Sequence, residues 1–237
     1  MADNFLMPPM ATDRWTNCQP RGRTDDEKDR LLETEALGSE PLNITVAGHS
    51  FINHLNTFAC NNYGYWHNFK LQQEVAAVKC IGISGATVEK IINLHLHKIV
   101  ENKPNIVYLE VGSNDICDPS ITAKQVGDRI KELCVMIHNL GVKRVVVGEI
   151  TFRVGRGIPS KTPDYNYKVL SLNKRLQVLL DHNVDPSYFF WRHKYLWNSQ
   201  LNIYRDGVHY NKDGNRRLFR SIRGALLKMM WEVKSTD

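Results

Sequence analysis

The sequence predicts an α/β fold in which a parallel sheet is covered by helices on both faces. From residue 42 onward, short apolar segments typical of strands alternate with longer segments of helical periodicity. Turn residues rich in glycine, serine and asparagine follow the first three strands. The segment 143–150 also contains three consecutive valines, which is typical of a strand buried on both faces.

The expected strands are delimited by alternation and by turn residues. The first alternates Leu42, Ile44 and Val46 and ends at Gly48, and Pro104 precedes the third. In chain order we expect strands over 42–48, 74–83, 106–111, 143–150 and 188–191.

Apolar residues at helical spacing predict the intervening helices, and Gly141 closes the longest of them. We expect helices over 50–58, 88–100, 121–140, 165–180 and 213–233. In such sheets ligands bind beyond the carboxyl ends of the strands, so residues that directly follow a strand are the first candidates for a site.

Length and composition indicate one domain preceded by a tail. The chain has 237 residues. Residues 1–40 contain the charged run 25–30 and few periodic apolar positions, so we expect a disordered tail followed by a folded domain over 41–237. The net charge of +6 favours anionic partners such as nucleic acid or acidic membrane, although many soluble enzymes carry such a charge.

The sequence predicts a cytoplasmic or nuclear location. No run approaches the roughly 18 apolar residues of a membrane span, and the first residues lack the basic and apolar regions of a secretory signal. The five cysteines are widely spaced and form no CxxC pair, which argues against a disulfide framework and against a zinc site.

Two candidate segments follow the first two strands. Ser50 opens a helix, where its hydroxyl would lie at the mouth of the sheet and the helix dipole would favour negative charge. An ordinary helix N-cap is the alternative for Ser50. Gly85 lets a backbone N–H approach a ligand closely, and a simple strand-to-helix turn is its alternative.

Two further segments complete the set. Asn114, after the third strand, can donate a hydrogen bond to an oxyanion, or can belong to a plain Asn/Asp turn. Asp206 and His209, three residues apart before the last helix, can lie side by side, with the carboxylate orienting the imidazole. The alternative there is an Asp cap beside a half-exposed histidine.

Taken together, in this order and at these places, the four segments resemble the SGNH/GDSL hydrolase family. The matching residues are Ser50, Gly85, Asn114, Asp206 and His209, and the resemblance covers about residues 42–232. It implies a three-layer α/β/α sandwich with a five-stranded parallel sheet in flavodoxin-like order. It also implies Ser50, Asp206 and His209 as catalytic residues, and Ser50, Gly85 and Asn114 as the oxyanion hole.

Two details qualify the resemblance. The family's usual Gly-Asp-Ser-Leu is Gly-His-Ser-Phe here, so His49 replaces an acid and is expected to alter the electrostatics around Ser50. The stretches 205–209 and 215–224 are similar to an animal branch of esterase-like domains associated with retrotransposons. The GxSxG elbow, the Walker A loop and the GxGxxG motif are absent from the sequence.

The resemblance implies a serine esterase that cleaves small acyl groups, such as acetyl, through an acyl-enzyme on Ser50. It requires no metal and no cofactor. Its substrate is a small-molecule, lipid or carbohydrate ester, which the sequence leaves open, as it does the oligomeric state.

The alternative is a binding module with the same fold and little or no turnover. Arg216, Arg220 and Arg223 follow helical spacing on the last helix and form a basic face that suits nucleic acid or acidic membrane. A solvated surface is the simpler interpretation of that face. The opposite stripe is expected to face the core and consists of Leu218, Ile222, Ala225 and Met229.

Overall fold

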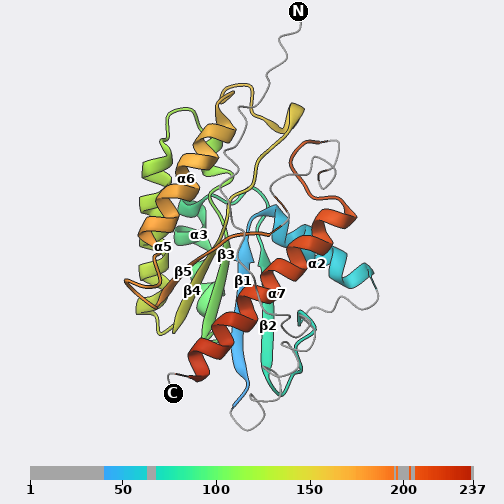
Figure 1. The fold of residues 1–237 in the computed structure, drawn as a ribbon, viewed down its shortest axis with the longest axis vertical. Helices are drawn as coiled ribbons and strands as arrows, with labels where there is room; N and C mark the ends of the chain where they lie inside the picture. The colour runs from blue at the N-terminus through green and yellow to red at the C-terminus, as the bar shows by residue number, and fades with distance from the viewer. Residues whose placement is uncertain (1–39, 63–67, 195, 197–202, 204–205, 236–237) are drawn as a thin grey trace, which may run out of the picture.

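The computed structural model describes residues 40–62, 68–194, 196, 203 and 206–235. Its centre is a five-stranded, all-parallel sheet in the order β2-β1-β3-β4-β5 (Figure 1). The strands are β1 (Leu42–Gly48), β2 (Ala76–Gly82), β3 (Ile106–Glu110), β4 (Arg144–Gly148) and β5 (Tyr188–Trp191). The predicted fold class and the flavodoxin-like strand order are confirmed.

Helices cover both faces of the sheet. One face carries α2 (Ser50–Asn61) and α7 (Lys212–Lys234), which lie side by side (Figure 1). The other face carries α3 (Val88–Leu94), α4 (Leu96–Val100), α5 (Ala123–Asn139) and α6 (Tyr165–Leu179). Two short 3₁₀ turns, η1 (Asp115–Cys117) and η2 (Gly155–Gly157), follow β3 and β4.

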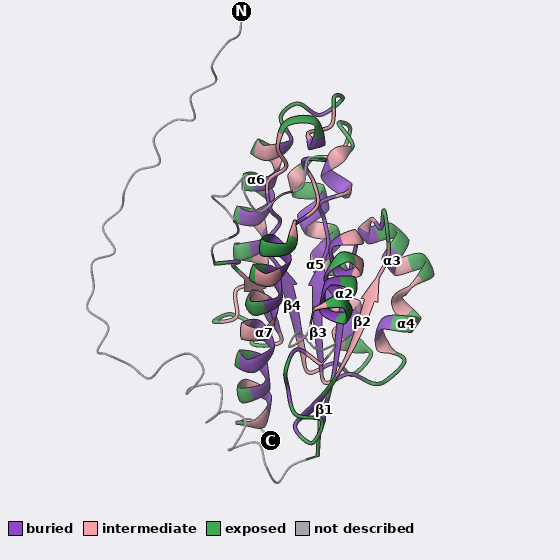
Figure 2. Ribbon diagram, turned by 90° about the vertical axis from the view of Figure 1, so that its right-hand side faces the viewer, coloured by how far each residue is buried: buried purple, intermediate pink, exposed green. Residues whose placement is uncertain are grey.

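Two hydrophobic cores lie on opposite sides of the central strands, because successive side chains of a strand point to opposite faces. Tyr108 and Val146 pack in the core beneath α2 and α7, whereas Leu109 and Val147 pack beneath α5 and α6. Figure 2 shows β3 and β4 as buried strands. The stripe predicted for the last helix is buried as expected, and consists of Leu218, Ile222, Ala225 and Met229.

The structure corrects one predicted helix. The segment 88–100 is not continuous, because the backbone of His95 (φ −131°, ψ −5°) leaves the helical region and separates α3 from α4. Leu94, just before the break, is 57% exposed, whereas Ile99, just after it, is fully buried. The apolar periodicity of the segment therefore belongs to two short helices that pack against the sheet separately.

The tail prediction for residues 1–40 lies almost entirely outside the described residues, so it stays a prediction. Among the described residues, the first strand, β1, begins at Leu42. Among the described residues, none of the helices has the length and apolar character required to span a bilayer.

Candidate active site

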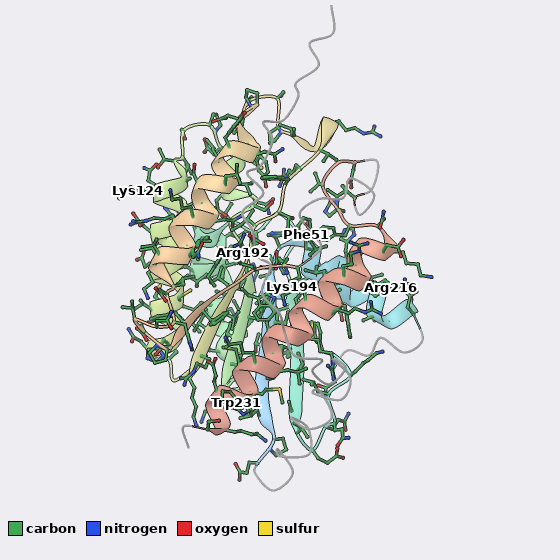
Figure 3. The ribbon with its side chains drawn as sticks, in the orientation of Figure 1. Phe51, Lys124, Arg192, Lys194, Arg216 and Trp231 are labelled. Carbon is green, nitrogen blue, oxygen red and sulfur yellow. The ribbon has the colours of Figure 1, made fainter. Side chains whose placement is uncertain are left out.

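Strand order brings the candidate segments to one edge of the sheet. Because β1 lies between β2 and β3, Gly48 pairs with both Gly82 and Glu110 at the carboxyl ends of the strands. The residues that follow these three ends are Ser50, Gly85 and Asn114, and Phe51, one residue beyond Ser50, marks this edge in Figure 3.

Ser50, His209 and Asp206 form a continuous chain of hydrogen bonds. Ser50 Oγ lies 2.9 Å from His209 Nε2, and His209 Nδ1 lies 2.8 Å from Asp206 Oδ2. An ionised carboxylate only accepts hydrogen bonds, so His209 donates through Nδ1. In the neutral imidazole Nε2 then carries the lone pair and accepts from the Ser50 hydroxyl, which is the arrangement of a nucleophile and its base.

The turn that carries Asp206 and His209 is held by hydrogen bonds within it and by close packing against the backbone of Val154. Asp206 Oδ1 accepts from the N–H groups of Val208 (2.9 Å) and His209 (3.0 Å). Gly207 has φ +75°, and a Cβ there would lie 2.0 Å from the carbonyl oxygen of Val154, so the turn requires glycine. Desolvation raises the pKa of Asp206, but its hydrogen bonds with Val208 and His209 outweigh this effect and hold the pKa below its usual value.

Ser50 is not the helix cap that its sequence context allows. His49 is the N-cap of α2, and its Nδ1 accepts from the N–H of Phe51 at 3.5 Å. Ser50 is the first residue of α2, so its own N–H has no acceptor within the helix. Neither the hydroxyl nor the N–H of Ser50 is therefore used to cap the helix.

Gly85 and Asn114 lie beside this centre. Gly85 has φ +66° with open space where a Cβ would be, and no acceptor in the described part of the chain takes its N–H. The Asn114 amide donates one of its two hydrogens to the carbonyl oxygen of Ala86 at 2.9 Å. This bond fixes Asn114 against the Gly85 turn and leaves its second N–H for a ligand.

Arg153, which the sequence analysis did not single out, holds the other end of the Asn114 side chain. Its Nη2 donates to Asn114 Oδ1 (3.3 Å) and to the carbonyl oxygen (3.3 Å) and Oγ (3.2 Å) of Ser113. The guanidinium stacks on the Tyr165 ring, 4.8 Å from its centroid, and the Arg153 backbone exchanges two hydrogen bonds with Asn166. Arg153 lies in the loop that follows β4, so the expectation that site residues follow strand ends is the one sequence signal that could have drawn attention to it.

His49 is neutral at neutral pH. Its side chain is buried, and desolvation lowers its pKa to about 4, although the nearby Glu110 opposes the shift. Arg153 and His209 add smaller effects in the lowering direction. The substitution of the family's usual acid by His49 therefore removes a negative charge beside Ser50 without adding a positive one.

Two aromatic rings confine the imidazole of His209. His54 of α2 stacks on it at a centroid distance of 4.3 Å and an interplanar angle of 6°. Phe51 approaches edge-on at 5.9 Å. Burial and then His209 lower the pKa of His54, while Asp206 opposes this shift. His54 thus presents an uncharged ring to His209 near neutral pH.

The thiols do not form an alternative centre. Cys117 Sγ donates to the carbonyl oxygen of Ser113 at 3.3 Å, and burial raises its pKa, which disfavours the nucleophilic thiolate. The four described cysteines are all free thiols. Within the described residues, His, Cys, Asp and Glu side chains form no cluster suited to a metal ion.

A family comparison agrees with this geometry. The sequence model of the GDSL-like lipase/acylhydrolase family matches residues 46–217, which is most of the chain. The chain therefore belongs to this family and is a hydrolase. The more specific resemblance to a retrotransposon-associated branch is not part of that finding. No curated protein sequence gives a significant match.

Solved structures with the same fold include a presumed acylhydrolase from Bacteroides fragilis (TM-score 0.62, 18% identity, covering 88% of this chain and 100% of that one). A GDSL-like lipase from Bacteroides thetaiotaomicron is similar (TM-score 0.59, 18%, 85% and 98%). So is a catalytic mutant of an acetylxylan esterase from Geobacillus stearothermophilus (TM-score 0.57, 14%, 78% and 93%). At these identities the likeness concerns the fold.

Proposed function

We propose that the protein hydrolyses carboxylic esters of small acyl groups through an acyl-enzyme on Ser50. The observation that carries this proposal is the hydrogen-bonded chain from Ser50 Oγ through His209 to Asp206, at 2.9 and 2.8 Å. It supplies a nucleophile, a base and a group that orients the base.

The reaction runs in two balanced steps. Ser50 Oγ attacks the acyl carbon while its proton moves to His209 Nε2, and His209 then gives that proton to the departing alcohol as the ester C–O bond breaks. Water next attacks the acyl-enzyme with His209 again taking the proton, and Ser50 recovers its hydrogen as the carboxylic acid leaves. Asp206 stabilises the imidazolium that forms in both steps.

Three donors are available for the negative charge that develops on the acyl oxygen. The N–H of Ser50 lies at the start of α2, where the helix dipole favours an anion. The Gly85 N–H and the second Asn114 N–H have no acceptor within the described chain. We propose these three groups as the oxyanion hole.

A small acyl group, such as acetyl, is the proposed substrate feature. Several solved structures of this fold are named for acetyl esters, among them the acetylxylan esterase and an acetyl esterase with acetate bound. Those names describe the other proteins, and they supply the first esters to test here. No cofactor takes part in the proposed steps.

The test is hydrolysis of p-nitrophenyl esters of increasing acyl length by the purified chain and by Ser50→Ala. We expect Ser50-dependent release of p-nitrophenol that is fastest with acetate and falls as the acyl chain lengthens. Equal release by the wild type and Ser50→Ala would refute the proposal, and a preference for long chains would refute the acyl-size part alone.

The second candidate is an SGNH-fold binding module that contacts nucleic acid or acidic membrane through α7. Arg216 and Arg220 support it, because both lie on one side of α7 toward its amino-terminal end, with Arg216 labelled in Figure 3. Two contacts weaken it. Arg223 donates through Nε to the carbonyl oxygen of Phe69 at 3.0 Å, and Arg216 lies 3.3 Å from Asp213. The esterase proposal therefore takes precedence.

We also propose a cytoplasmic or nuclear location, which the free thiols of the four described cysteines support. The similarity of residues 205–209 and 215–224 to retrotransposon-associated esterase-like domains leads us to propose that branch of the family. Finding the protein in an oxidising compartment would overturn the proposed location. Finding it encoded in a transcript unrelated to retrotransposons would overturn the proposed branch.

A further inference from the structure

The imidazole ring of His54 lies flat against the imidazole ring of His209. His54 lies one helical turn beyond Ser50 on α2, and residues four apart on a helix share a face. The two ring centroids are 4.3 Å apart and the ring planes are inclined by only 6°. Figure 1 shows α2 beside α7, which begins just after the turn that carries His209. The stack therefore joins two elements that are distant in sequence.

Different groups hold the His209 ring in its plane and across its face. Ser50 Oγ and Asp206 Oδ2 hydrogen-bond to its two nitrogens at 2.9 and 2.8 Å. The lone pair and the N–H bond of an imidazole lie in the plane of the ring, so these two bonds resist rotation within that plane. His54 instead covers one face of the ring, where it resists tilting.

The stack is the contact that orders the His54 side chain. Among the described residues, no hydrogen bond and no ion pair reaches the His54 ring nitrogens, and the side chain is exposed. Neither burial in the core nor a polar network therefore accounts for its orientation. A histidine that is held only by stacking on the proposed base is placed to act on that base.

The charged groups around the two rings leave His54 neutral near neutral pH. Asp206 binds His209 from the turn before α7, and Lys212, at the start of α7, lines the same surface hollow as His54. Burial and then His209 lower the pKa of His54, whereas Asp206 opposes this change. His49, whose pKa His209 also lowers, is neutral at this pH.

A neutral ring beside His209 favours the charged form of the base. In the proposed reaction His209 takes the Ser50 proton and becomes an imidazolium. The face of a neutral aromatic ring carries negative partial charge, which attracts a cation held over it. The attraction is strongest when His209 is charged, so it stabilises the transition state more than the neutral resting enzyme.

We propose that His54 is a positioning residue that holds the ring of His209 and stabilises the imidazolium formed during turnover. The proposal rests on the esterase function of Ser50. It adds to that function a group that acts on the base from outside the hydrogen-bonded chain of Ser50, His209 and Asp206.

His54→Leu tests this role, because it removes the aromatic face and keeps a side chain of similar size. Loss of a cation–π contact at an exposed site corresponds to about a two- to fivefold change. On the plateau of the pH–rate profile, kcat/KM for p-nitrophenyl acetate should fall by this factor. The midpoint of the acid limb should move to lower pH by about 0.3–0.7 unit, because the protonated base is less stabilised.

The shape of the profiles separates this role from a purely structural one. At pH values well below the midpoint, the wild type and His54→Leu should have equal kcat/KM, because the contact stabilises the imidazolium equally in the transition state and in the protonated resting enzyme. A change that merely disturbs the site would lower kcat/KM at every pH. His54→Phe supplies an aromatic face that cannot ionise, so it should recover most of what leucine loses.

His97→Leu is the matched control. His97 is an exposed histidine of α4, on the opposite face of the sheet, and its replacement should leave the pH–rate profile unchanged. Because both histidines are exposed, the melting temperatures of His54→Leu and His97→Leu should stay within a few degrees of the wild type.

An NMR titration of the His209 ring in the Ser50→Ala protein measures the contact without turnover. Adding His54→Leu to that protein should lower the midpoint of the His209 titration by about 0.3–0.7 pH unit, the same shift as in the kinetic profile. Adding His97→Leu should not move it.

The two proposals fail in different ways. Absence of Ser50-dependent hydrolysis of any ester would overturn the esterase function, and with it the role of His54 in turnover. Where Ser50-dependent hydrolysis is present, three results would each overturn the role of His54 alone. These are an unchanged profile in His54→Leu, an equal loss at every pH, and a His209 titration midpoint that the leucine leaves in place.

Discussion

Arg153→Met tests whether the guanidinium assists catalysis through Asn114. In the structure Arg153 Nη2 donates to Asn114 Oδ1, while the amide nitrogen of Asn114 is held by Ala86. Removing Arg153 leaves one of these two restraints. A hydrogen bond from a charged donor contributes about 1.5–3 kcal/mol, which corresponds to a fall of roughly 10- to 100-fold in kcat.

The assay is steady-state hydrolysis of p-nitrophenyl acetate by the wild type, Arg153→Met, Asn114→Ala and the double variant. Loss of one oxyanion donor costs about 10²–10³ in kcat, so Asn114→Ala sets the upper limit. Because Arg153 is expected to act through Asn114, Arg153→Met should add little once Asn114 is gone. KM should change little in each case.

Tyr165→Phe is the matched control, because the Tyr165 hydroxyl contacts Ser113 Oγ at 2.8 Å but does not contact Asn114. It should lower kcat less than Arg153→Met does. The reasoning is refuted if Arg153→Met is as costly in the Asn114→Ala background as in the wild type, or if it raises KM while kcat is unchanged.

Three further predictions concern the surroundings of the site. Burial holds the pKa of His49 at about 4 in the folded protein, against about 6.5 in the unfolded chain. The free energy of unfolding should therefore fall as the pH drops from 6.5 toward 4, by about 2 kcal/mol at pH 5. The variant His49→Asn, which keeps an N-cap, should flatten this dependence in urea titrations at pH 7 and pH 5. A chain beginning at Glu40 should keep the melting temperature and esterase activity of the full chain, and a drop of many degrees would contradict this. If α7 binds nucleic acid, replacing Arg216 and Arg220 should reduce the dependence of affinity on salt, and no detectable binding at low salt would end that idea.

The strands and most helices were predictable because their signals are local. Alternation at Leu42, Ile44 and Val46, the valine run of β4 and the glycine after α5 each act over a few residues. The break at His95 was missed because apolar spacing continues through it, and only contact with the sheet distinguishes buried Ile99 from exposed Leu94.

The difference between local signals and long-range contacts also separates the site residues that the sequence predicts from the one that it misses. Ser50, Gly85, Asn114 and the Asp206–His209 pair follow strands or precede the last helix, so sequence order was enough to name them. Arg153 meets Asn114 across 39 positions, between loops after different strands, and no local pattern reports such a contact.

The roles of Ser50 and His209 as one unit give a kinetic expectation. Ser50→Ala and His209→Ala should each remove nearly all hydrolysis, and the double variant should be hardly worse, because a nucleophile without its base is as ineffective as no nucleophile. Asp206→Ala should cost less, since Asp206 orients the base without touching the ester.

The most direct test of the account is the mass of the protein and of its Ser50 peptide after reaction with a p-nitrophenyl phosphonate, which forms a stable bond to an activated serine. We expect one covalent adduct for each chain, located on Ser50, formed slowly in His209→Ala and absent from Ser50→Ala. An adduct on another residue, or an unmodified wild-type chain that still hydrolyses p-nitrophenyl acetate, would contradict the assignment of Ser50 as the nucleophile.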